Sequence, residues 1–392
     1  MTPPLGFRFA ATYAGIRKVA REDLALMVSD RRAAAAAVFT ANLVKAAPLL
    51  VSAKYLAQTR GYCRAVVANA GNANCATGSG ERVARATARA AAAALGIREP
   101  EVLLASTGVI GVPLNARPIL EALPRLAAAL APENFDVASR AILTTDTRPK
   151  TASAAVRLKS GTVRVVGMAK GAGMIHPRMA TMLGFIFTDA ALTPAELRPM
   201  LAAAVETSFN RISVDGDTST NDTVYLLANG ASGVRLAGAE RKKVQAALAE
   251  VAGQLAVAIV RDGEGARKLL TIMVEGASSD AAAARIARSI ANSPLVKTAL
   301  AGADPNWGRF LSAAGNAGVS FDPGKMDIEL NGIPVCRRGK DVKFSESDVQ
   351  RSLEAPESTV RLVIRGRGQG RARFWTCDMT EDYIRINASY RT

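Results

Sequence analysis

A single threonine hydroxyl stands between a loop of small residues and an apolar run. Gly171 and Gly173 open the loop, and Ala180 and Thr181 close it before residues 182–187, whose continuous apolar character is typical of a buried strand. If the chain cut itself between Ala180 and Thr181, the new α-amine would lie beside the Thr181 hydroxyl. The nucleophile and its base would then belong to one residue.

The chain contains one histidine, His176, and this limits the chemistry. A two-histidine metal site of the H-E-x-x-H type is excluded, and His176 itself precedes a proline in a predicted loop, where an exposed or hydrogen-bonding role is expected. A general base must therefore come from elsewhere, and an α-amine has an ordinary pKa of about 7.7–8.0. From the residues alone, however, a plain strand-entry threonine is the preferred interpretation of Thr181, because β-branched residues are common in strands.

The composition indicates a large globular protein. The chain has 392 residues, of which 49% are hydrophobic and 5% aromatic, so we expect two or three domains or one large α/β unit. The N-terminus lacks the apolar core of a signal peptide, and no apolar stretch approaches membrane-spanning length, so we expect a soluble, cytoplasmic protein. The cysteines show no C-x-x-C spacing and predict reduced thiols without a metal: Cys63, Cys75, Cys336 and Cys377.

The excess of basic over acidic residues raises the question of whether the protein binds nucleic acid. The formal net charge is +16, and the densest basic stretch covers residues 361–374. Its apolar flanks and central glycines predict a β-hairpin with solvated arginines near the turn, and no nucleic-acid-binding motif accompanies it. Part of the excess charge could serve substrates that carry carboxylates.

Strands and helices alternate over most of the chain. Hydrophobic periodicity and capping residues predict strands at 64–69, 102–105, 223–228 and 268–274, and helices at 81–95, 116–130, 240–260, 280–291 and from residue 194. The last hundred residues differ, because Asn331-Gly332 signals a hairpin and further strands are predicted at 359–364, 373–377 and 383–386. This β-rich region is expected to begin between residues 280 and 300.

Several long motifs occur in one order along the chain. They are TTDTRPK, GMIHPRMATML, VDGDTSTNDT, NSPLVKTA and DPNWGR, and each contains polar or turn-forming residues that suit binding as well as packing. Together they resemble the ornithine acetyltransferase family of arginine biosynthesis. The resemblance runs nearly end to end, from Gly6 to Thr392.

The resemblance implies a fold and a maturation step. The fold is an α/β/β/α layered sandwich, shared with self-processing aminopeptidases, with a smaller β-rich subdomain at about 285–392. Self-cleavage between Ala180 and Thr181 would give an α chain, 1–180, which carries the oxyanion hole, and a β chain, 181–392, which carries the nucleophile. Two copies of each are expected to form an α₂β₂ assembly.

The resemblance also implies a reaction and its residues. The acetyl group of N²-acetylornithine would pass to Thr181 and then to glutamate, with Thr107 (hydroxyl) and Gly108 (N–H) stabilising the oxyanion. Acetyl-CoA is a possible second donor, and neither a metal nor another cofactor is implied. The implied substrate-binding residues are Thr144, Lys170, Thr181, Glu264, Asn387 and Thr392.

Three alternatives remain open at this point. A paralogous acyltransferase of β-lactam metabolism and a self-processing aminopeptidase share the nucleophile chemistry, and turnover without glutamate would indicate the aminopeptidase. A basic nucleic-acid-binding protein built on residues 361–374 would show steeply salt-dependent retention of DNA.

Overall fold

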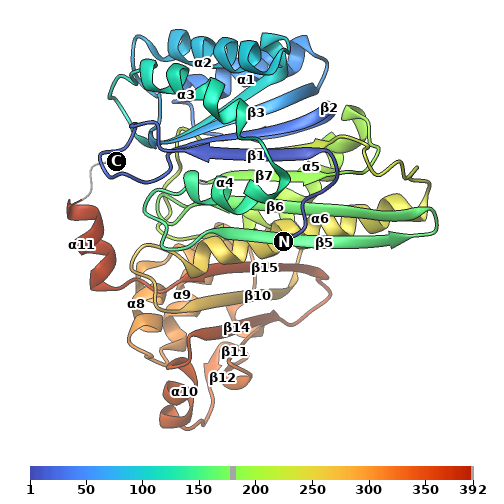
Figure 1. Cartoon of the computed structure of the whole chain (residues 1–392). Helices are drawn as coiled ribbons and strands as arrows, with labels where there is room; N and C mark the ends of the chain where they lie inside the picture. The colour runs from blue at the N-terminus through green and yellow to red at the C-terminus, as the bar shows by residue number, and fades with distance from the viewer. Residues whose placement is uncertain (177–181, 390–392) are drawn as a thin grey trace.

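The computed structural model describes residues 1–176 and 182–389. The residues Ala180, Thr181 and Thr392, to which the sequence assigns roles, lie outside the described part of the chain. Within that part, the secondary structure forms two β-sheets with helices layered against them (Figure 1). The predicted mixed, layered α/β architecture is confirmed.

The first sheet runs in the order β4-β3-β2-β9-β7-β6-β5, and β1 pairs with β2. Strand β7 pairs with β6 on one side and with β9 on the other. Every residue of β7 and β9 is buried, which explains why both strands are apolar apart from one terminal threonine each. The bounds are β1 Phe7–Thr12, β2 Leu24–Phe39, β3 Tyr62–Asn72, β4 Val102–Val109, β5 Lys150–Leu158, β6 Gly161–Lys170, β7 Leu183–Thr188 and β9 Thr223–Ala228.

Helices from the first 141 residues, α1 to α4, cover one face of this sheet (Figure 1). In α2 a stripe of alanines faces the core, which allows close packing, and Gly96 ends the helix in the left-handed conformation. Phe9 packs edge-on against Phe135 and Phe187 beneath the helices. The bounds are α1 Ala47–Gln58, α2 Gly80–Leu95, α3 Arg117–Ala128 and α4 Phe135–Ala141.

The opposite face is covered by α5, Pro194–Thr207, and α6, Ala239–Arg261. Thr193 caps α5 by accepting the N–H of Glu196, as the sequence predicts. Helix α6 is long and apolar enough to meet a membrane-span criterion, which the sequence analysis did not anticipate, but half of that stretch is buried inside the protein. It packs against β5, β6 and α5 and also touches β15, Gly370–Cys377, of the second sheet, which is the setting of a core helix.

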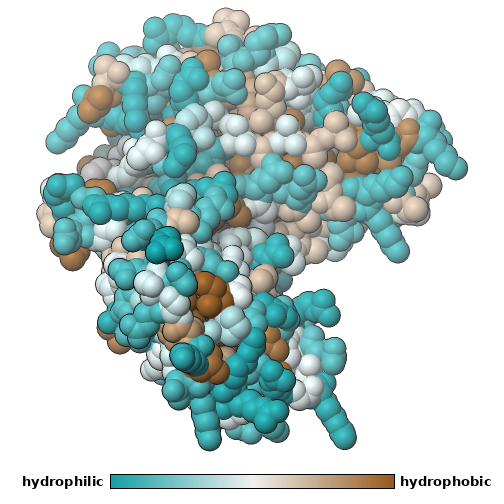
Figure 2. Space-filling view, turned by 90° about the horizontal axis from the view of Figure 1, so that it is seen from below, coloured by the Kyte–Doolittle hydropathy of each residue, from teal (hydrophilic) through white to brown (hydrophobic). Residues whose placement is uncertain are grey.

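The second sheet has the order β13-β12-β11-β14-β10-β15-β8. Helix α7 packs on β10 and β15, and α9 packs on α7. Hydrophilic residues cover most of the face seen from below, with strongly hydrophobic ones in small separate groups (Figure 2). The bounds are β8 Ile212–Ser213, β10 Leu269–Ala277, β11 Met326–Leu330, β12 Ile333–Arg337, β13 Lys340–Asp341, β14 Glu357–Ile364, β15 Gly370–Cys377, α7 Asp280–Ala291, α8 Pro294–Ala301, α9 Trp307–Gly315 and α10 Glu346–Leu353.

Two sequence-based predictions for this region are wrong. Residues 361–374 do not form a hairpin, because β10 lies between β14 and β15 and pairs with both. Residues 383–386 are not a strand but part of helix α11, Glu381–Ser389. The Asn331-Gly332 hairpin is confirmed, with both residues at positive φ between β11 and β12. The sheet also includes β8 and β10, which precede the range 285–392 predicted for the β-rich subdomain.

Candidate active site

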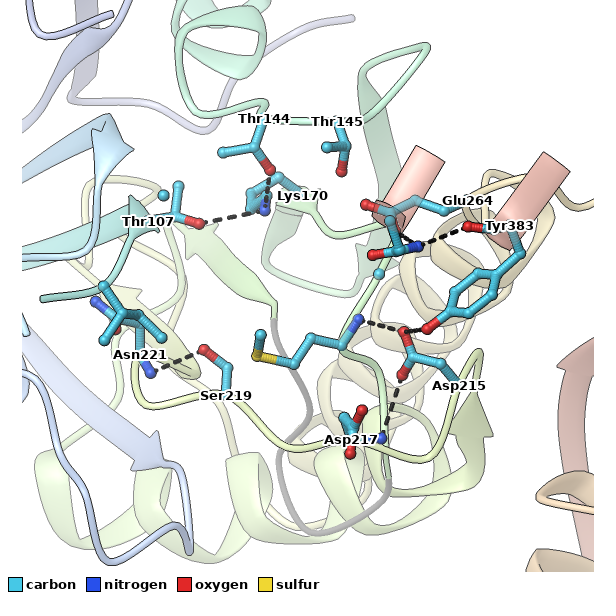
Figure 3. A pocket seen from close by; sticks show the side chains of 15 residues that line it. Thr107, Thr144, Thr145, Lys170, Asp215, Asp217, Ser219, Asn221, Glu264 and Tyr383 are labelled. Carbon is cyan, nitrogen blue, oxygen red and sulfur yellow. Dashed lines mark hydrogen bonds between the residues drawn. The ribbon is translucent and has the colours of Figure 1, made fainter. Parts of the chain in front are cut away.

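Six of the residues that the family resemblance implied line a cavity of about 330 Å³ (Figure 3). They come from the end of β4, the loop after α4, the end of β6, the turn after α6 and helix α11. Segments more than 250 residues apart in sequence therefore share one site. The six residues are Thr107, Gly108, Thr144, Lys170, Glu264 and Asn387.

Thr107 and Gly108 end β4, where the backbone runs very close to β3. Gly108 has φ +133°, and a Cβ atom there would lie 2.2 Å from the carbonyl carbon of Gly71. A side chain cannot be accommodated at that distance, so only glycine allows the two strands to approach. The close approach fixes the backbone of Gly108 at the cavity wall.

Lys170 is the last residue of β6 and is only 3% exposed. Its ammonium group donates to the hydroxyl of Thr144 at 2.6 Å and to the hydroxyl of Thr107 at 3.2 Å. Burial lowers the pKa of Lys170, and the nearby Asp146 carboxylate opposes this effect. A buried cation thus holds two threonine hydroxyls in place.

Asp146 supplies the countercharge, a role that the sequence analysis missed. It accepts hydrogen bonds from the N–H groups of Thr144 and Gly171, at 2.9 and 2.6 Å, and lies 3.9 Å from the Lys170 ammonium. Although burial acts to raise it, the ammonium groups of Lys170 and Lys150 hold the pKa of Asp146 below its usual range. The motif TTDTRPK contained Asp146, but nothing in its spacing indicated which cation the carboxylate would face.

The ion pairs continue away from the cavity. Lys150 is buried and donates to both Asp146 and Asp262, the residue that follows α6. Removing one member of such a buried set leaves an uncompensated charge, which typically costs about 3–5 kcal/mol. The network therefore ties the lysine in the cavity to the end of α6.

Glu264 lies in the turn after α6, opposite Lys170 across the cavity (Figure 3). Its N–H donates to the carbonyl of Ala172 at 2.8 Å, and its carboxylate accepts from the side-chain amide of Asn387 at 2.9 Å. A Cβ atom at Gly173 would lie 2.3 Å from the Glu264 carboxylate, so a larger residue there would push the carboxylate out of this position. Helix α11 thereby positions the carboxylate.

Further polar residues that line the cavity were not assigned a role from the sequence. Four of them belong to the motif VDGDTSTNDT, residues 214–223, which the sequence analysis quoted without giving its carboxylates or amide a role. Asp215 accepts the N–H groups of Met174 and Ile175, at 2.5 and 2.9 Å, and the hydroxyl of Tyr383 at 3.3 Å. Burial raises the pKa of Asp215, and burial together with Asp215 raises the pKa of Tyr383. These unassigned polar residues are Thr145, Asp215, Asp217, Ser219, Asn221 and Tyr383.

Asn221 and Asp222 connect the start of β9 to the cavity. The side-chain amide of Asn221 donates to the carbonyls of Ala73 and Ser106, at 2.7 and 2.8 Å. The fully buried carboxyl of Asp222 accepts the N–H of Met182 at 3.1 Å, and burial raises its pKa well above the usual value. Met182 directly follows Thr181 in the sequence, so Asp222 fixes the backbone next to the predicted nucleophile.

His176 has the hydrogen-bonding role expected of a loop residue. Its Nδ1 atom lies 3.3 Å from the side-chain nitrogen of Asn292, whose oxygen accepts the hydroxyl of Ser213. It is not among the residues that line the cavity. The chemistry of this site therefore does not depend on imidazole.

The cavity combines a cation on one side with carboxylates on the other. Lys170 lies between two threonine hydroxyls, while Glu264, Asp215 and Asp217 face it across the open space (Figure 3). Such an arrangement suits small molecules that carry a carboxylate and an ammonium group. The fold and the site define an α/β enzyme with a cavity that suits amino acids.

The comparisons with known proteins give the particular family. The chain belongs to the ArgJ family, whose model matches residues 8–392. It is thus an acetyltransferase of arginine biosynthesis, as the sequence resemblance implied.

Relatives of nearly equal length match almost the whole chain. The chain is 47% identical over 396 residues to the arginine biosynthesis bifunctional protein ArgJ of Bradyrhizobium diazoefficiens, covering 99% of this chain and 95% of the relative. It is 48% identical over 390 residues to the protein of that name from Thermus thermophilus, covering 99% of each. A crystal structure of ArgJ from Bacillus halodurans is 38% identical, with a TM-score of 0.51, and covers 53% of this chain and 98% of that chain.

Proposed function

We propose that the protein transfers the acetyl group of N²-acetylornithine to glutamate through an acetyl ester on Thr181. The observation that carries the proposal is the Lys170 ammonium, buried and bonded to the hydroxyls of Thr107 and Thr144, opposite the carboxylate of Glu264. Family membership supports acetyl transfer in arginine biosynthesis. The donor, the acceptor and the roles of individual residues are our inference.

Maturation would begin with cleavage between Ala180 and Thr181. The Thr181 hydroxyl attacks the Ala180 carbonyl, the peptide becomes an ester, and water releases the Thr181 amine. The lengths of solved chains support this proposal, because the Bacillus halodurans chain aligns over 98% of itself with only 53% of this chain. A β chain of residues 181–392 would likewise be slightly more than half of the whole.

Both substrates carry an α-carboxylate, and ornithine adds an ammonium group. Lys170 would bind the carboxylate, and Glu264, oriented by Asn387, would bind the ammonium group of ornithine. Thr144 lies within 2.6 Å of the Lys170 ammonium and would join the carboxylate site. Thr392 completes the substrate-binding set that the family resemblance implies.

The amine of Thr181 would take the proton of its own hydroxyl as the hydroxyl attacks the acetyl carbonyl. The developing oxyanion would be met by the Thr107 hydroxyl and the Gly108 N–H. Because Lys170 already donates to the Thr107 oxygen, the threonine proton is free to donate elsewhere. One such oxyanion donor typically contributes about 3 kcal/mol to the transition state.

The first half of the cycle ends when the protonated amine of Thr181 gives its proton to departing ornithine, which leaves the acetyl ester on Thr181. The amine of glutamate then attacks the acetyl ester, which releases N-acetylglutamate and restores the hydroxyl. No metal and no bound cofactor is needed for these steps. We also propose an α₂β₂ assembly of the two pieces.

Steady-state kinetics tests this proposal. Varying N²-acetylornithine at several fixed glutamate concentrations should give parallel double-reciprocal lines, because ornithine leaves before glutamate reacts. Intersecting lines would contradict a covalent acetyl-enzyme. Comparable release of ornithine without glutamate would instead indicate a hydrolase.

A further inference from the structure

The motif VDGDTSTNDT, residues 214–223, holds the backbone on both sides of the proposed cleavage point. On one side, the first N–H group of the motif donates to the carbonyl of Ile175 at 2.9 Å. On the other side, the carboxyl of Asp222 accepts the N–H of Met182 at 3.1 Å. The proposed cleavage point lies between these two anchors in the sequence, and the functions considered so far give the motif no chemical role there.

Self-cleavage needs a proton acceptor other than the α-amine. In the unbroken chain the nitrogen of Thr181 belongs to a peptide bond, whose resonance removes its basicity, so it cannot take the proton of the Thr181 hydroxyl. The same nitrogen must gain a proton when its bond to Ala180 breaks. Another group must therefore carry this proton from oxygen to nitrogen during maturation.

The carboxyl of Asp222 has an oxygen available for this task. Its Oδ1 atom accepts the N–H of Met182, whereas its Oδ2 atom is buried and has no hydrogen-bond partner among the described residues. The hydroxyl of Thr40, whose N–H donates to the Asp222 carbonyl, donates to the carbonyl of Ser219 at 2.8 Å. Because Thr181 is bonded to the Met182 nitrogen, covalent geometry keeps its own nitrogen and hydroxyl within about 5 Å of that atom.

The surroundings of Asp222 suit a group that takes up a proton and returns it. The residue is 0% exposed, and burial raises its pKa well above the usual value. The Met182 N–H and the positive charge of Lys170 act in the opposite direction. A carboxylate with a raised pKa is a stronger base than one in water, and its acid form still gives up the proton to an amine.

Other titratable groups near the cavity are already engaged. Both oxygens of Asp215 accept backbone N–H groups, at 2.5, 2.9 and 3.2 Å. Asp146 pairs with two lysine ammonium groups, which hold its pKa below the usual range, and Glu264 accepts the amide of Asn387. Of the two carboxyls that contact the backbone flanking the cleavage point, Asp222 is therefore the one with an oxygen that has no partner among the described residues.

We propose that Asp222 is the proton carrier of self-cleavage: its free oxygen takes the proton of the Thr181 hydroxyl and returns it to the Thr181 nitrogen. This inference rests on the proposed function, because it concerns the same bond between Ala180 and Thr181. Once that bond is broken, the freed α-amine takes over as the base for acetyl transfer.

The step balances with the transfer of one proton. The bond from Thr181 Oγ to the carbonyl carbon of Ala180 forms as the hydroxyl proton moves to Asp222, and the carbonyl oxygen becomes an oxyanion. The carbon–nitrogen bond then breaks as the oxyanion returns to a carbonyl and Asp222 gives its proton to the Thr181 nitrogen. An ester and a free amine result, and water cleaves the ester.

Asp222→Asn tests the assignment, because the amide keeps the size of the side chain and an oxygen for the Met182 N–H but cannot carry the proton. Cleavage of newly made chains, followed on denaturing gels after a pulse of labelled amino acid, should slow by about a hundredfold or more. Asp378→Asn is the matched control. Asp378 is also buried, accepts the N–H groups of Arg267 and Lys268 through one oxygen, and has a second oxygen without a partner among the described residues. This control should be cleaved as fast as the wild type.

Both variants should keep the circular dichroism spectrum and the elution volume of the wild type. Cleavage of Asp222→Asn at the wild-type rate would overturn the assignment and leave the proposed function intact. Equal slowing in Asp222→Asn and Asp378→Asn would also overturn it, because any loss of a buried carboxyl would then have the same effect. A wild-type chain that transfers acetyl groups without being cleaved would instead contradict the proposed function.

The wild type alone gives a second test, which decides the matter if Asp222→Asn does not fold. The cleavage rate of newly made wild-type chains should rise from acidic to neutral pH, because Asp222 must lose its proton before it acts as a base. Lys170 is the charged group that acts on Asp222, and it stays protonated over this range. A cleavage rate that does not change with pH would overturn the assignment.

Discussion

The buried charge of Lys170 determines the character of the site. An ammonium group at 3% exposure is costly unless it is paired, and Asp146 together with two threonine hydroxyls compensates it here. A cation in so dry a setting interacts more strongly with a substrate carboxylate than one in water would. The family resemblance implied a role for Lys170, but Asp146 emerged only from the fold, because charge pairing across loops has no local signature.

Gly108 provides a test at the level of one residue. In Gly108→Ala the new Cβ atom would meet Gly71 at 2.2 Å and force β4 away from β3, so we expect kcat to fall by about a hundredfold or more as the oxyanion site is displaced. Gly78→Ala is the matched control, because nothing lies within 4 Å of a Cβ atom there. Equal activity in the two variants, measured as acetyl transfer to glutamate, would remove Gly108 from the site.

The rate should depend on pH through two groups, one that must be deprotonated and one that must be protonated. The Thr181 amine must be deprotonated to act as a base, so kcat/KM should rise with pH through about 7.7–8.0. Lys170 must be protonated to bind a carboxylate, and burial lowers its pKa, so the rate should fall again before the ordinary lysine value of about 10.4. In Lys170→Arg the descending limb should move to higher pH. A descending limb that stays in place would show that another group titrates there.

At the scale of elements, helix α11 closes the site from the far end of the chain. Tyr383 and Asn387 lie on one side of this helix and reach Asp215 and Glu264. The sequence predicted a strand here from its aromatic and β-branched residues, whereas Glu381 and Asp382 in the first turn favour a helix. Hydrogen bonds from Tyr383 and Asn387 join this helix to the cavity, and such tertiary contacts are invisible to local propensity.

Gly265 is the point of contact that this helix requires. It has φ +71°, and a Cβ atom there would lie 2.4 Å from the backbone nitrogen of Tyr383. In Gly265→Ala we expect α11 to shift and the KM for N²-acetylornithine to rise about tenfold or more, since Glu264 loses its amide partner.

Gly253→Ala in α6 is the control for this change. Its Cβ atom would meet nothing within 4 Å, and alanine in a helix should raise stability by up to about 1 kcal/mol. Thermal unfolding and KM should therefore separate the two alanine variants. An unchanged KM in Gly265→Ala would show that α11 does not hold Glu264.

Strongly patterned elements were predictable from the sequence, and long-range pairings were not. The strand predicted at 223–228 and the helix predicted at 240–260 match β9 and α6 closely because continuous burial and helical periodicity leave direct patterns. The prediction of a hairpin at 361–374 was wrong because β14 and β15 are neighbours in sequence but not in the sheet. Insertion of β10, from ninety residues earlier, depends on the whole fold.

At the scale of the whole molecule, the two predicted pieces are interwoven. Strands β7 and β9, which follow residue 181, lie between β2 and β6, which precede it. After cleavage, β9 would still pair with β2 and β7 with β6, so strands of the β chain would remain hydrogen-bonded to strands of the α chain. We expect the pieces to elute together in size-exclusion chromatography and to separate only under denaturing conditions, whereas separation in native buffer would contradict this view.

The basic balance of the protein is partly compensated within the fold. In the stretch once considered for nucleic acid, Arg361 pairs with Glu275 and Glu329, and Arg365 pairs with Asp327. These two arginines interact with carboxylates of the second sheet, so part of the positive charge in this stretch is compensated.

Intact-mass spectrometry after incubation with N²-acetylornithine alone tests the central claim most directly. We expect two polypeptides, one ending at Ala180 and one beginning at Thr181, with a single added acetyl group on the second, and we expect Thr181→Ala to remain one unmodified, inactive chain. A preparation that transfers acetyl groups yet contains only the unbroken polypeptide would contradict the account.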